Sequence, residues 1–264
     1  MSGKKYGDLL RERIFDPLGM SDSGLDTDTL LLPKRAEGYM RGPKGLMVAH
    51  SESMTVPFAA GSIYSTTGDL LKWEHGLFGG KLITADSLKA MTTPGLGDYG
   101  MGVIIRNEGG LKVVTHDGGI EGFNTNLIYV PDKRICVVVL ANVNGSVPAQ
   151  MGPQLLDVVL GKPVILASER KPVPIAKEEL AKFVGVYDLA PTFSLTVAQA
   201  ADGLTVQGTG QPAFPIMYQG VVDGHPRFFI AAVSAELEFV PDAAGAIQSL
   251  ILHQGGANVP AKKH

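Results

Sequence analysis

The sequence has one cysteine, one tryptophan and no apolar run long enough to span a bilayer. A single cysteine excludes an internal disulfide, and Cys136 lies in the apolar run Ile135–Ala141, where a small buried side chain is expected rather than a reactive thiol. The net charge is −3 without a block of like charge, so neither a nucleic-acid surface nor a polybasic membrane patch is expected. No apolar segment follows Met1–Lys5, so this stretch is not read as a signal peptide.

Glycine and proline, by contrast, are abundant, with 33 and 17 residues in a chain of 264. Such a composition predicts many turns and favours a β-rich or mixed chain over a helical bundle. The hydrophobic content of 45% is enough to bury one large core or two modest ones.

Helical spacing is clearest in the first third of the chain. Apolar residues four apart predict a helix over Tyr6–Phe15, which Pro17 and Gly19 are expected to end. Thr66 and Thr84 are expected to cap the next two helices, and Asp69 completes a capping-box pattern with Thr66. Residues 20–60 show little periodicity, and a long irregular segment of this kind is often functional.

From Tyr99 the pattern changes to the period of two that is typical of strands. Short connections between these strands predict an antiparallel meander, with a turn over residues 117–122. The last strand is apolar without alternation, so it is expected to be covered on both faces. A helix over Val147–Leu160 should follow. The expected strands are 99–106, 111–116, 123–130 and 135–141.

A proline-rich stretch predicts a domain boundary. Residues 162–176 read as a linker between a first domain, 1–161, and a second domain, 177–264. After a short helix over Ala176–Phe183, the second domain carries short β-type runs separated by Gly, Pro and Asp, as in a small antiparallel barrel. These runs are Gly185–Leu189, Phe193–Gln199, Leu204–Gly208, Phe214–Tyr218, Arg227–Val233, Glu236–Val240 and Ile247–His253.

Five motifs in order give residues 5–160 a family resemblance. They are "LRERIFDPLGM" (Leu10–Met20), "AAGSIYSTTGDLLKW" (Ala59–Trp73), "YGMGV" (Tyr99–Val103), "HDGGIEGF" (His116–Phe123) and the Pro-Asp turn with its apolar strand to "LAN". This part resembles the serine hydrolases that include class C β-lactamases, D-alanyl-D-alanine carboxypeptidases and esterases. Residues 180–257 resemble the lipocalin-like barrel often appended to such enzymes. The expected fold is α+β, an antiparallel sheet with helices forming part of a β-lactamase/transpeptidase-like fold, followed by a small all-β barrel.

The resemblance implies three active-site motifs, of which the third can be placed. His116-Asp117-Gly118 matches His-x-Gly, and Gly119 falls where the strand would donate a backbone N–H to the oxyanion. His116, Gly118 and Gly119 are therefore the candidate catalytic residues, while Asp117 and Glu121 are candidates for contact with substrate. The alternative is a purely structural role, in which His116 lies at a strand end and Asp117 forms an Asx-turn.

Neither a cofactor nor a metal is expected. His50, His75, His225 and His253 lack metal-like spacing.

The first two motifs, Ser-x-x-Lys and Tyr-x-Asn, are not found where the family has them. A Ser-x-x-Lys string, Ser168–Lys171, lies in the linker and is interpreted as a chance match. In the family both motifs precede the helix at Leu10–Met20. The chain thus reads as the C-terminal portion of a penicillin-binding-protein-like or β-lactamase-related hydrolase, truncated at its N-terminus and inactive alone.

Two rival hypotheses remain open. The fold could serve as a non-catalytic binding or assembly module, or a separate chain could supply the serine and tyrosine. The parent's substrate would be a small ester or amide, or a peptidoglycan-like molecule. Loss of the preceding segment would expose the apolar strand Ile135–Leu140, which predicts self-association through that sheet edge.

Overall fold

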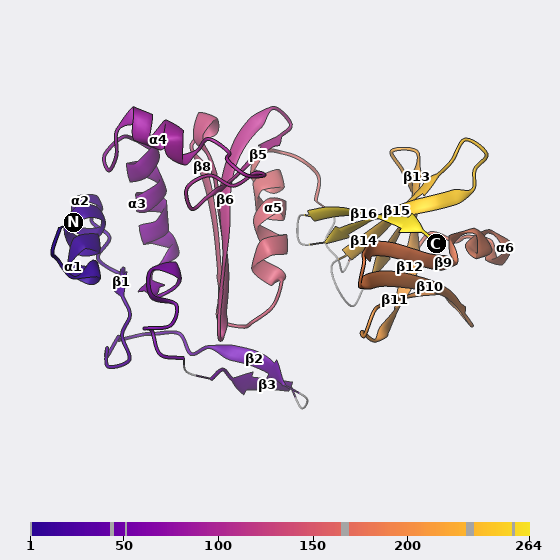
Figure 1. Ribbon diagram of the computed structural model, residues 1–264, viewed down its shortest axis with the longest axis horizontal. Coiled ribbons are helices and arrows are strands. Elements are labelled where there is room, and N and C mark those ends of the chain that lie inside the picture. The colour runs from indigo at the N-terminus through magenta and orange to yellow at the C-terminus, as the bar shows by residue number, and fades with distance from the viewer. Residues whose placement is uncertain (1, 43–44, 51, 165–168, 231–234, 255–256) are drawn as a thin grey trace. The chain divides into compact units, whose positions relative to one another are not determined.

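The computed structural model describes residues 2–42, 45–50, 52–164, 169–230, 235–254 and 257–264. Within these limits the chain forms two compact units, Met1–Lys162 and Pro163–His264 (Figure 1). Ser168 of the linker string and the end of the expected strand Arg227–Val233 lie outside the described residues. No described helix has the length and apolarity that crossing a membrane would require.

The first helical segment is longer than expected. It comprises α1 (Tyr6–Leu10), a π-helical turn η1 (Arg11–Phe15) and α2 (Asp16–Leu18). The expectation that Pro17 ends the helix is wrong, because helical structure continues from the π-helical turn through Pro17 to Leu18. Gly19 ends the segment with φ of 65°, the left-handed conformation that glycine adopts without strain.

The irregular region 20–60 contains only short pieces of regular structure. β1 (Gly24–Leu25) pairs with β4 (Ile63–Tyr64) beyond it, and β2 (Tyr39–Gly42) forms a hairpin with β3 (Gly45–Val48). A 3-10 turn, η2 (Phe58–Ala60), precedes β4. The backbone N–H of Tyr39 donates to Asn142 O, which ties this region to the main sheet.

The expected N-caps are confirmed. α3 (Thr67–Phe78) begins after Thr66, and α4 (Ala85–Met91) begins after Thr84; each threonine hydroxyl accepts a backbone N–H of the first turn. Asp69 does not complete the capping box. Its buried carboxylate instead accepts hydrogen bonds from Ser23 Oγ and the Asp22 N–H and pairs with Lys72, so it fastens the chain after α2 to α3.

The central sheet of the first unit has the strand order β5-β6-β7-β8, with antiparallel neighbours throughout. α3 lies on one face of this sheet and α5 on the other (Figure 1). β8 pairs with β7 alone among the described strands, so it forms an edge of the sheet. α3 and α5 contact β8, although Leu140 on it stays exposed. The elements are β5 (Ile104–Glu108), β6 (Leu111–Ile120), β7 (Phe123–Val130), the turn η3 (Pro131–Lys133), β8 (Ile135–Ala141) and α5 (Val147–Val159).

β5 starts later than the expected 99–106 because glycines shape the preceding residues. Gly97 and Gly102 have positive φ, and only an isolated bridge joins Tyr99 to Ile104. The segment before β5 is therefore a loop that an isolated bridge between Tyr99 and Ile104 holds against β5, rather than a strand.

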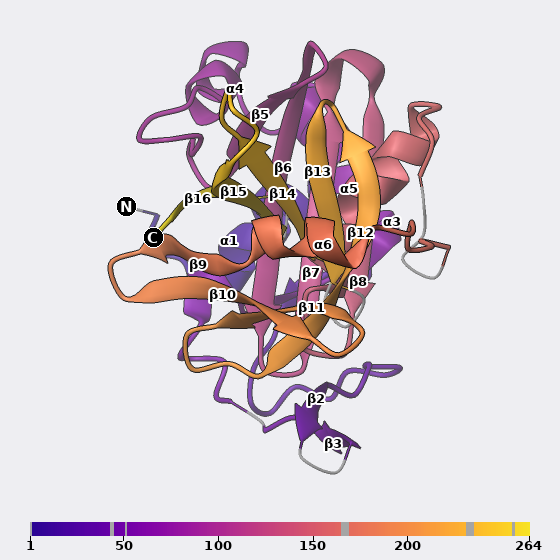
Figure 2. The ribbon, with the colours of Figure 1, turned by 90° about the vertical axis from the view of Figure 1, so that its right-hand side faces the viewer.

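The second unit is a closed barrel, as expected. After a short helical stretch, α6 (Lys177–Leu180) with η4 (Ala181–Phe183), its eight strands pair antiparallel in chain order, and β16 returns to β9. Figure 2 shows β9 between β10 and β16. The strands are β9 (Gly185–Ala190), β10 (Phe193–Ala200), β11 (Gly203–Gly208), β12 (Ala213–Val222), β13 (His225–Ile230), β14 (Ala235–Pro241), β15 (Ile247–Gln254) and β16 (Ala257–Lys263).

Aromatic side chains fill the interior of the barrel. Phe183, Phe228 and Phe239 contact one another edge to face, and Tyr187 packs on Phe239. Burial of these rings supplies the apolar core of the unit. The lipocalin-like character of the barrel stays a prediction.

Candidate functional site

The His-Asp-Gly-Gly stretch lies inside β6, and the expectation that a turn covers residues 117–122 is wrong. β6 continues to Ile120, and its second half, Val114–Ile120, pairs with β7. β5 pairs only with Leu111–Thr115. Among the described strands, none pairs with the other edge of His116–Ile120, so the backbone groups along this edge are open to a ligand.

His116 and Asp117 point to opposite faces of the sheet, because successive strand residues alternate. On the α3 face, the Tyr99 hydroxyl lies 2.9 Å from His116 Nε2, with the two rings edge to face. His116 Nδ1 lies 2.6 Å from the carbonyl oxygen of Asp117. Both ring nitrogens of the candidate catalytic histidine thus have partners within the protein.

Asp117 faces α5. Asn126 Nδ2 donates to Asp117 Oδ1 at 2.7 Å, and Asn126 is itself buried beneath Gly152 of α5. Any Cβ at Gly152 would collide with Asn126 Oδ1, so glycine is required for α5 to pack here. This places Asp117 on the face away from His116, and its assignment to substrate binding stays a prediction.

The two glycines have a packing reason of their own. A Cβ on Gly118 would collide with Thr125 Oγ1, and one on Gly119 would lie 2.9 Å from Asn124 Nδ2. Cross-strand side chains from β7 therefore occupy the room that the glycines leave. The catalytic roles assigned to His116, Gly118 and Gly119 stay predictions, but the open backbone edge that such roles need is present.

Two asparagines, Asn124 and Asn144, fix the end of β6 through hydrogen bonds that we did not predict from the sequence. Asn144 accepts from the Gly122 N–H at 2.7 Å and donates to Ile120 O at 2.8 Å. Asn124 donates to Gly118 O at 3.2 Å and accepts from the Gly145 N–H at 2.9 Å. The sequence does indicate this role, because asparagine stands near glycine at strand ends, where amide side chains often form hydrogen bonds with backbone N–H and C=O groups.

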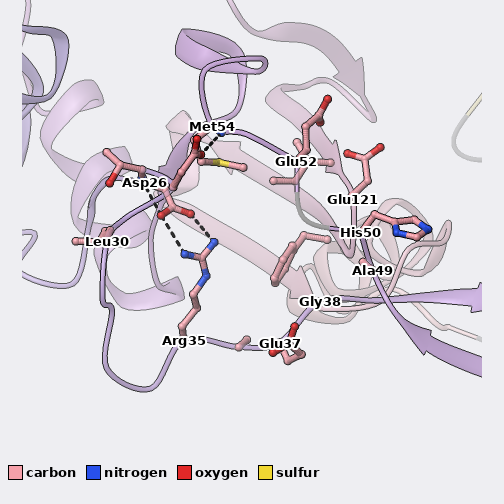
Figure 3. A pocket seen from close by; sticks show the side chains of 15 residues that line it. Asp26, Leu30, Arg35, Glu37, Gly38, Ala49, His50, Glu52, Met54 and Glu121 are labelled. Atoms are coloured by element: carbon pink, nitrogen blue, oxygen red, sulfur yellow. Dashed lines mark hydrogen bonds and ion pairs between the residues drawn. The ribbon is translucent and has the colours of Figure 1, made fainter.

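A cavity of about 270 Å³ lies where region 26–54 meets the β6–β7 turn. Figure 3 shows Arg35 reaching Asp26, to which its guanidinium donates twice, at 3.0 and 2.5 Å. The lining residues are Asp26, Thr27, Asp28, Leu30, Arg35, Ala36, Glu37, Gly38, Ala49, His50, Glu52, Met54, Ile120, Glu121 and Phe123.

Glu121, a predicted substrate contact, lies on the wall of this cavity beside Glu52. A hydrogen bond with Glu121, together with its charge, raises the pKa of Glu52. The neighbouring Glu121 carboxyl therefore favours the protonated form of Glu52 on the cavity wall. Whether Glu121 contacts a substrate stays a prediction.

The described residues contain no group of three or more His, Cys, Asp or Glu side chains arranged to hold a metal ion.

Comparison with known proteins agrees with this fold. The β-lactamase family model matches residues 1–160. Penicillin-binding protein 4* of Bacillus subtilis (strain 168) is 25% identical over 290 residues, which cover 98% of this chain and 62% of that protein. A D-aminopeptidase of Cereibacter sphaeroides (strain ATCC 17029 / ATH 2.4.9) is 26% identical over 61% of this chain and 32% of its own length.

Two solved structures share the fold. The octameric penicillin-binding protein homologue from Pyrococcus abyssi superposes with a TM-score of 0.58 at 22% identity, covering 99% of this chain and 61% of that one. The D-amino acid amidase from Ochrobactrum anthropi SV3, complexed with L-phenylalanine amide, gives 0.52 at 27% identity over 61% of this chain and 51% of that one. The chain thus spans less than two thirds of the length of these relatives. The match of the family model over residues 1–160 shows that the chain belongs to the β-lactamase family.

Proposed function

We propose that this chain forms one wall of the active site of an acyl-transfer hydrolase that cleaves small amides or esters. The observation that carries the proposal is the open edge of β6 over His116–Ile120. Backbone N–H groups held along a rigid strand stabilise the oxyanion that develops during acyl transfer. The names of the D-aminopeptidase and D-amino acid amidase relatives favour an amide among these substrates.

The nucleophile must come from elsewhere. Serine attacks an acyl carbon only when a neighbouring base takes its proton. The one Ser-x-x-Lys string ahead of β6, Ser2–Lys5, consists of exposed residues that precede α1 and does not start a buried helix. We therefore propose that the chain alone does not hydrolyse substrate, and that the C-terminal part of a hydrolase domain, residues 1–161, is joined through 162–176 to the barrel. Residual catalysis is small when nucleophile and base are both missing, since they act as a unit.

Incubation with a chromogenic cephalosporin, a nitrophenyl ester and a D-amino acid nitroanilide is expected to give no turnover above buffer. A fluorescent penicillin should likewise leave the protein unlabelled, as seen on a denaturing gel. A His116→Ala variant serves as the matched background. Turnover that disappears in Ser168→Ala would contradict the proposal and assign the linker serine as nucleophile.

The cavity beside β6 favours a second candidate, a non-catalytic binding module. Its volume of about 270 Å³ is near the lower end of the range for small-molecule sites. The same compounds would then raise the unfolding temperature of the chain without covalent labelling. Loss of that rise in Glu121→Gln would locate the ligand in the cavity.

We also propose that the chain self-associates through β8. No described strand pairs with the outer edge of β8. Leu140 on this strand is exposed, as are several apolar residues of the neighbouring α5. An apolar strand edge pairs readily with a second copy of itself.

Leu140→Lys is expected to abolish this association, because a charge on an edge strand opposes strand pairing. Leu71→Lys is the matched control, since Leu71 on α3 is equally exposed, at 40%. Sedimentation velocity over a concentration series measures the effect. A wild-type chain that stays monomeric throughout would refute the proposal.

A further inference from the structure

Tyr99 reaches the third-motif strand from a loop that its own backbone holds in place. The Gly95 N–H donates to Tyr99 O at 2.8 Å, the Met101 N–H to Met91 O at 2.9 Å, and the Ile105 N–H to Asp98 O at 2.8 Å. Gly100 packs so closely against the end of α4 that any Cβ there would collide with Met91 O. The Tyr99 hydroxyl is therefore delivered to a fixed position beside His116.

The partners of His116 determine where its proton lies. A carbonyl oxygen only accepts hydrogen bonds, so Nδ1, 2.6 Å from Asp117 O, must carry a proton. In a neutral imidazole the other nitrogen is then an acceptor, and Nε2 accepts a hydrogen bond from the Tyr99 hydroxyl, 2.9 Å away. The Asp117 carbonyl thus decides which nitrogen carries the proton, and the Tyr99 hydroxyl holds the ring in the orientation that keeps Nδ1 at that carbonyl.

We infer that Tyr99 is a positioning residue that sets the orientation of the His116 ring and thereby keeps Nδ1 at the Asp117 carbonyl, as the Nδ1–H tautomer. The hydrogen bond of one ring nitrogen commonly decides the state of the other. The role in catalysis rests on the proposed function, whereas the tautomer is a property of this chain alone.

This assignment has a consequence for the wall of the site. Neutral His116 has no free N–H to offer an oxyanion, because its single N–H already donates a hydrogen bond to Asp117 O. Donors at this strand are then the backbone N–H groups of the open β6 edge, and the half-exposed Tyr99 oxygen contributes lone pairs. Tyr99 thus sets which atoms of the wall can donate and which can accept.

Long-range ¹H–¹⁵N correlation spectra of the imidazole rings test the inference on the intact chain at a pH where His116 is neutral. In the wild type, His116 should show a protonated Nδ1 and an unprotonated Nε2 with well-separated ¹⁵N shifts. In Tyr99→Phe that separation should collapse as the two tautomers exchange. Met101→Leu, which alters the same loop without removing the hydroxyl, should keep the wild-type pattern.

Two results would overturn the inference. One is a wild-type spectrum with the proton on Nε2, and the other is an unchanged tautomer in Tyr99→Phe. The backbone ¹H–¹⁵N spectrum of Tyr99→Phe verifies that the fold persists. Because the measurement needs no turnover, an inactive chain with the Nδ1–H tautomer separates this inference from the proposed hydrolysis.

Discussion

Glu74→Gln is expected to make the first unit markedly more stable at pH 8 to 9 while leaving its stability near pH 5 almost unchanged. Glu74 lies on α3, is only 3% exposed, and buries its Oε2 without a hydrogen-bond partner among the described residues. Burial raises its pKa from 4.5 to about 8. A protonated carboxyl group is tolerated in such surroundings, but a carboxylate without a partner is not.

The direction in which stability changes with pH follows from the number of protons that the folded and unfolded chains bind. Between pH 4.5 and 8 the folded chain keeps the Glu74 proton and the unfolded chain loses it, so the folded state binds more protons. The free energy of unfolding therefore falls as pH rises through this window. At about 1.4 kcal/mol per pKa unit, the loss amounts to about 5 kcal/mol, and glutamine, which does not ionise, avoids it.

Trp73 offers the measurement, because it is the only tryptophan in the sequence and lies in the first unit beside Glu74. Urea titrations followed by its fluorescence at several pH values should show a falling wild-type curve and a flat Glu74→Gln curve. Glu37→Gln, at an exposed glutamate of the same unit, is the control, with an effect within about 0.5 kcal/mol. Parallel pH profiles for wild type and Glu74→Gln would refute the prediction.

Glu238→Ala is expected to destabilise the barrel by about 3–5 kcal/mol, the usual cost of removing one partner from a buried ion pair. Glu238 is buried on β14, where Arg227 Nη2 lies 2.6 Å from its carboxylate. His225 Nδ1 lies at 2.6 Å and His253 Nε2 at 2.9 Å. Truncation would leave three polar side chains from β13 and β15 without their shared acceptor.

Hydrogen exchange of β13, β14 and β15 measures this loss within the barrel, with the Trp73 transition as an internal reference for the first unit. Burial alone would raise the pKa of Glu238, but hydrogen bonds from His225 and His253 and the charge of Arg227 outweigh it and lower the pKa. The stabilisation of the barrel by the Glu238 carboxylate is thus fully present above the pKa of the unfolded chain, near 4.5. It is lost as the pH falls through the lower pKa of Glu238 in the folded chain.

Glu238→Gln is the matched variant, since it keeps one carbonyl acceptor but lacks the charge. At neutral pH it should destabilise the barrel less than alanine does. Its loss of stability relative to the wild type should become smaller at acidic pH, where the wild-type carboxylate is itself protonated. Equal exchange in wild type and Glu238→Ala would contradict the expected loss.

The alternation of apolar and polar residues in the sequence predicted much of the fold. The apolar runs around Ile128 and Val137 lie in β7 and β8 as the period of two indicates, and the barrel follows from the spacing of its strands. β16 escaped notice because Pro260 and nearby glycines disguise it as a loop, and pairing with β9 and β15 overrides that local preference.

The site was less accessible to sequence reasoning. Gly118 and Gly119 look like turn residues, yet they lie mid-strand because Thr125 and Asn124 on β7 need the space. Tyr99 and Asn144 act through contacts 17 and 24 residues away in the chain, which no local pattern reveals. The isolation of Glu74 likewise depends on what surrounds it in three dimensions.

Closure of the barrel couples its two ends during synthesis. β9 is its first strand to leave the ribosome, yet one of its two neighbours, β16, is the last. Until β16 arrives, β9 and β15 each keep a free edge that can capture another nascent chain. The barrel unit is therefore exposed to misassembly for as long as its synthesis lasts, and its final strand removes both open edges in one step.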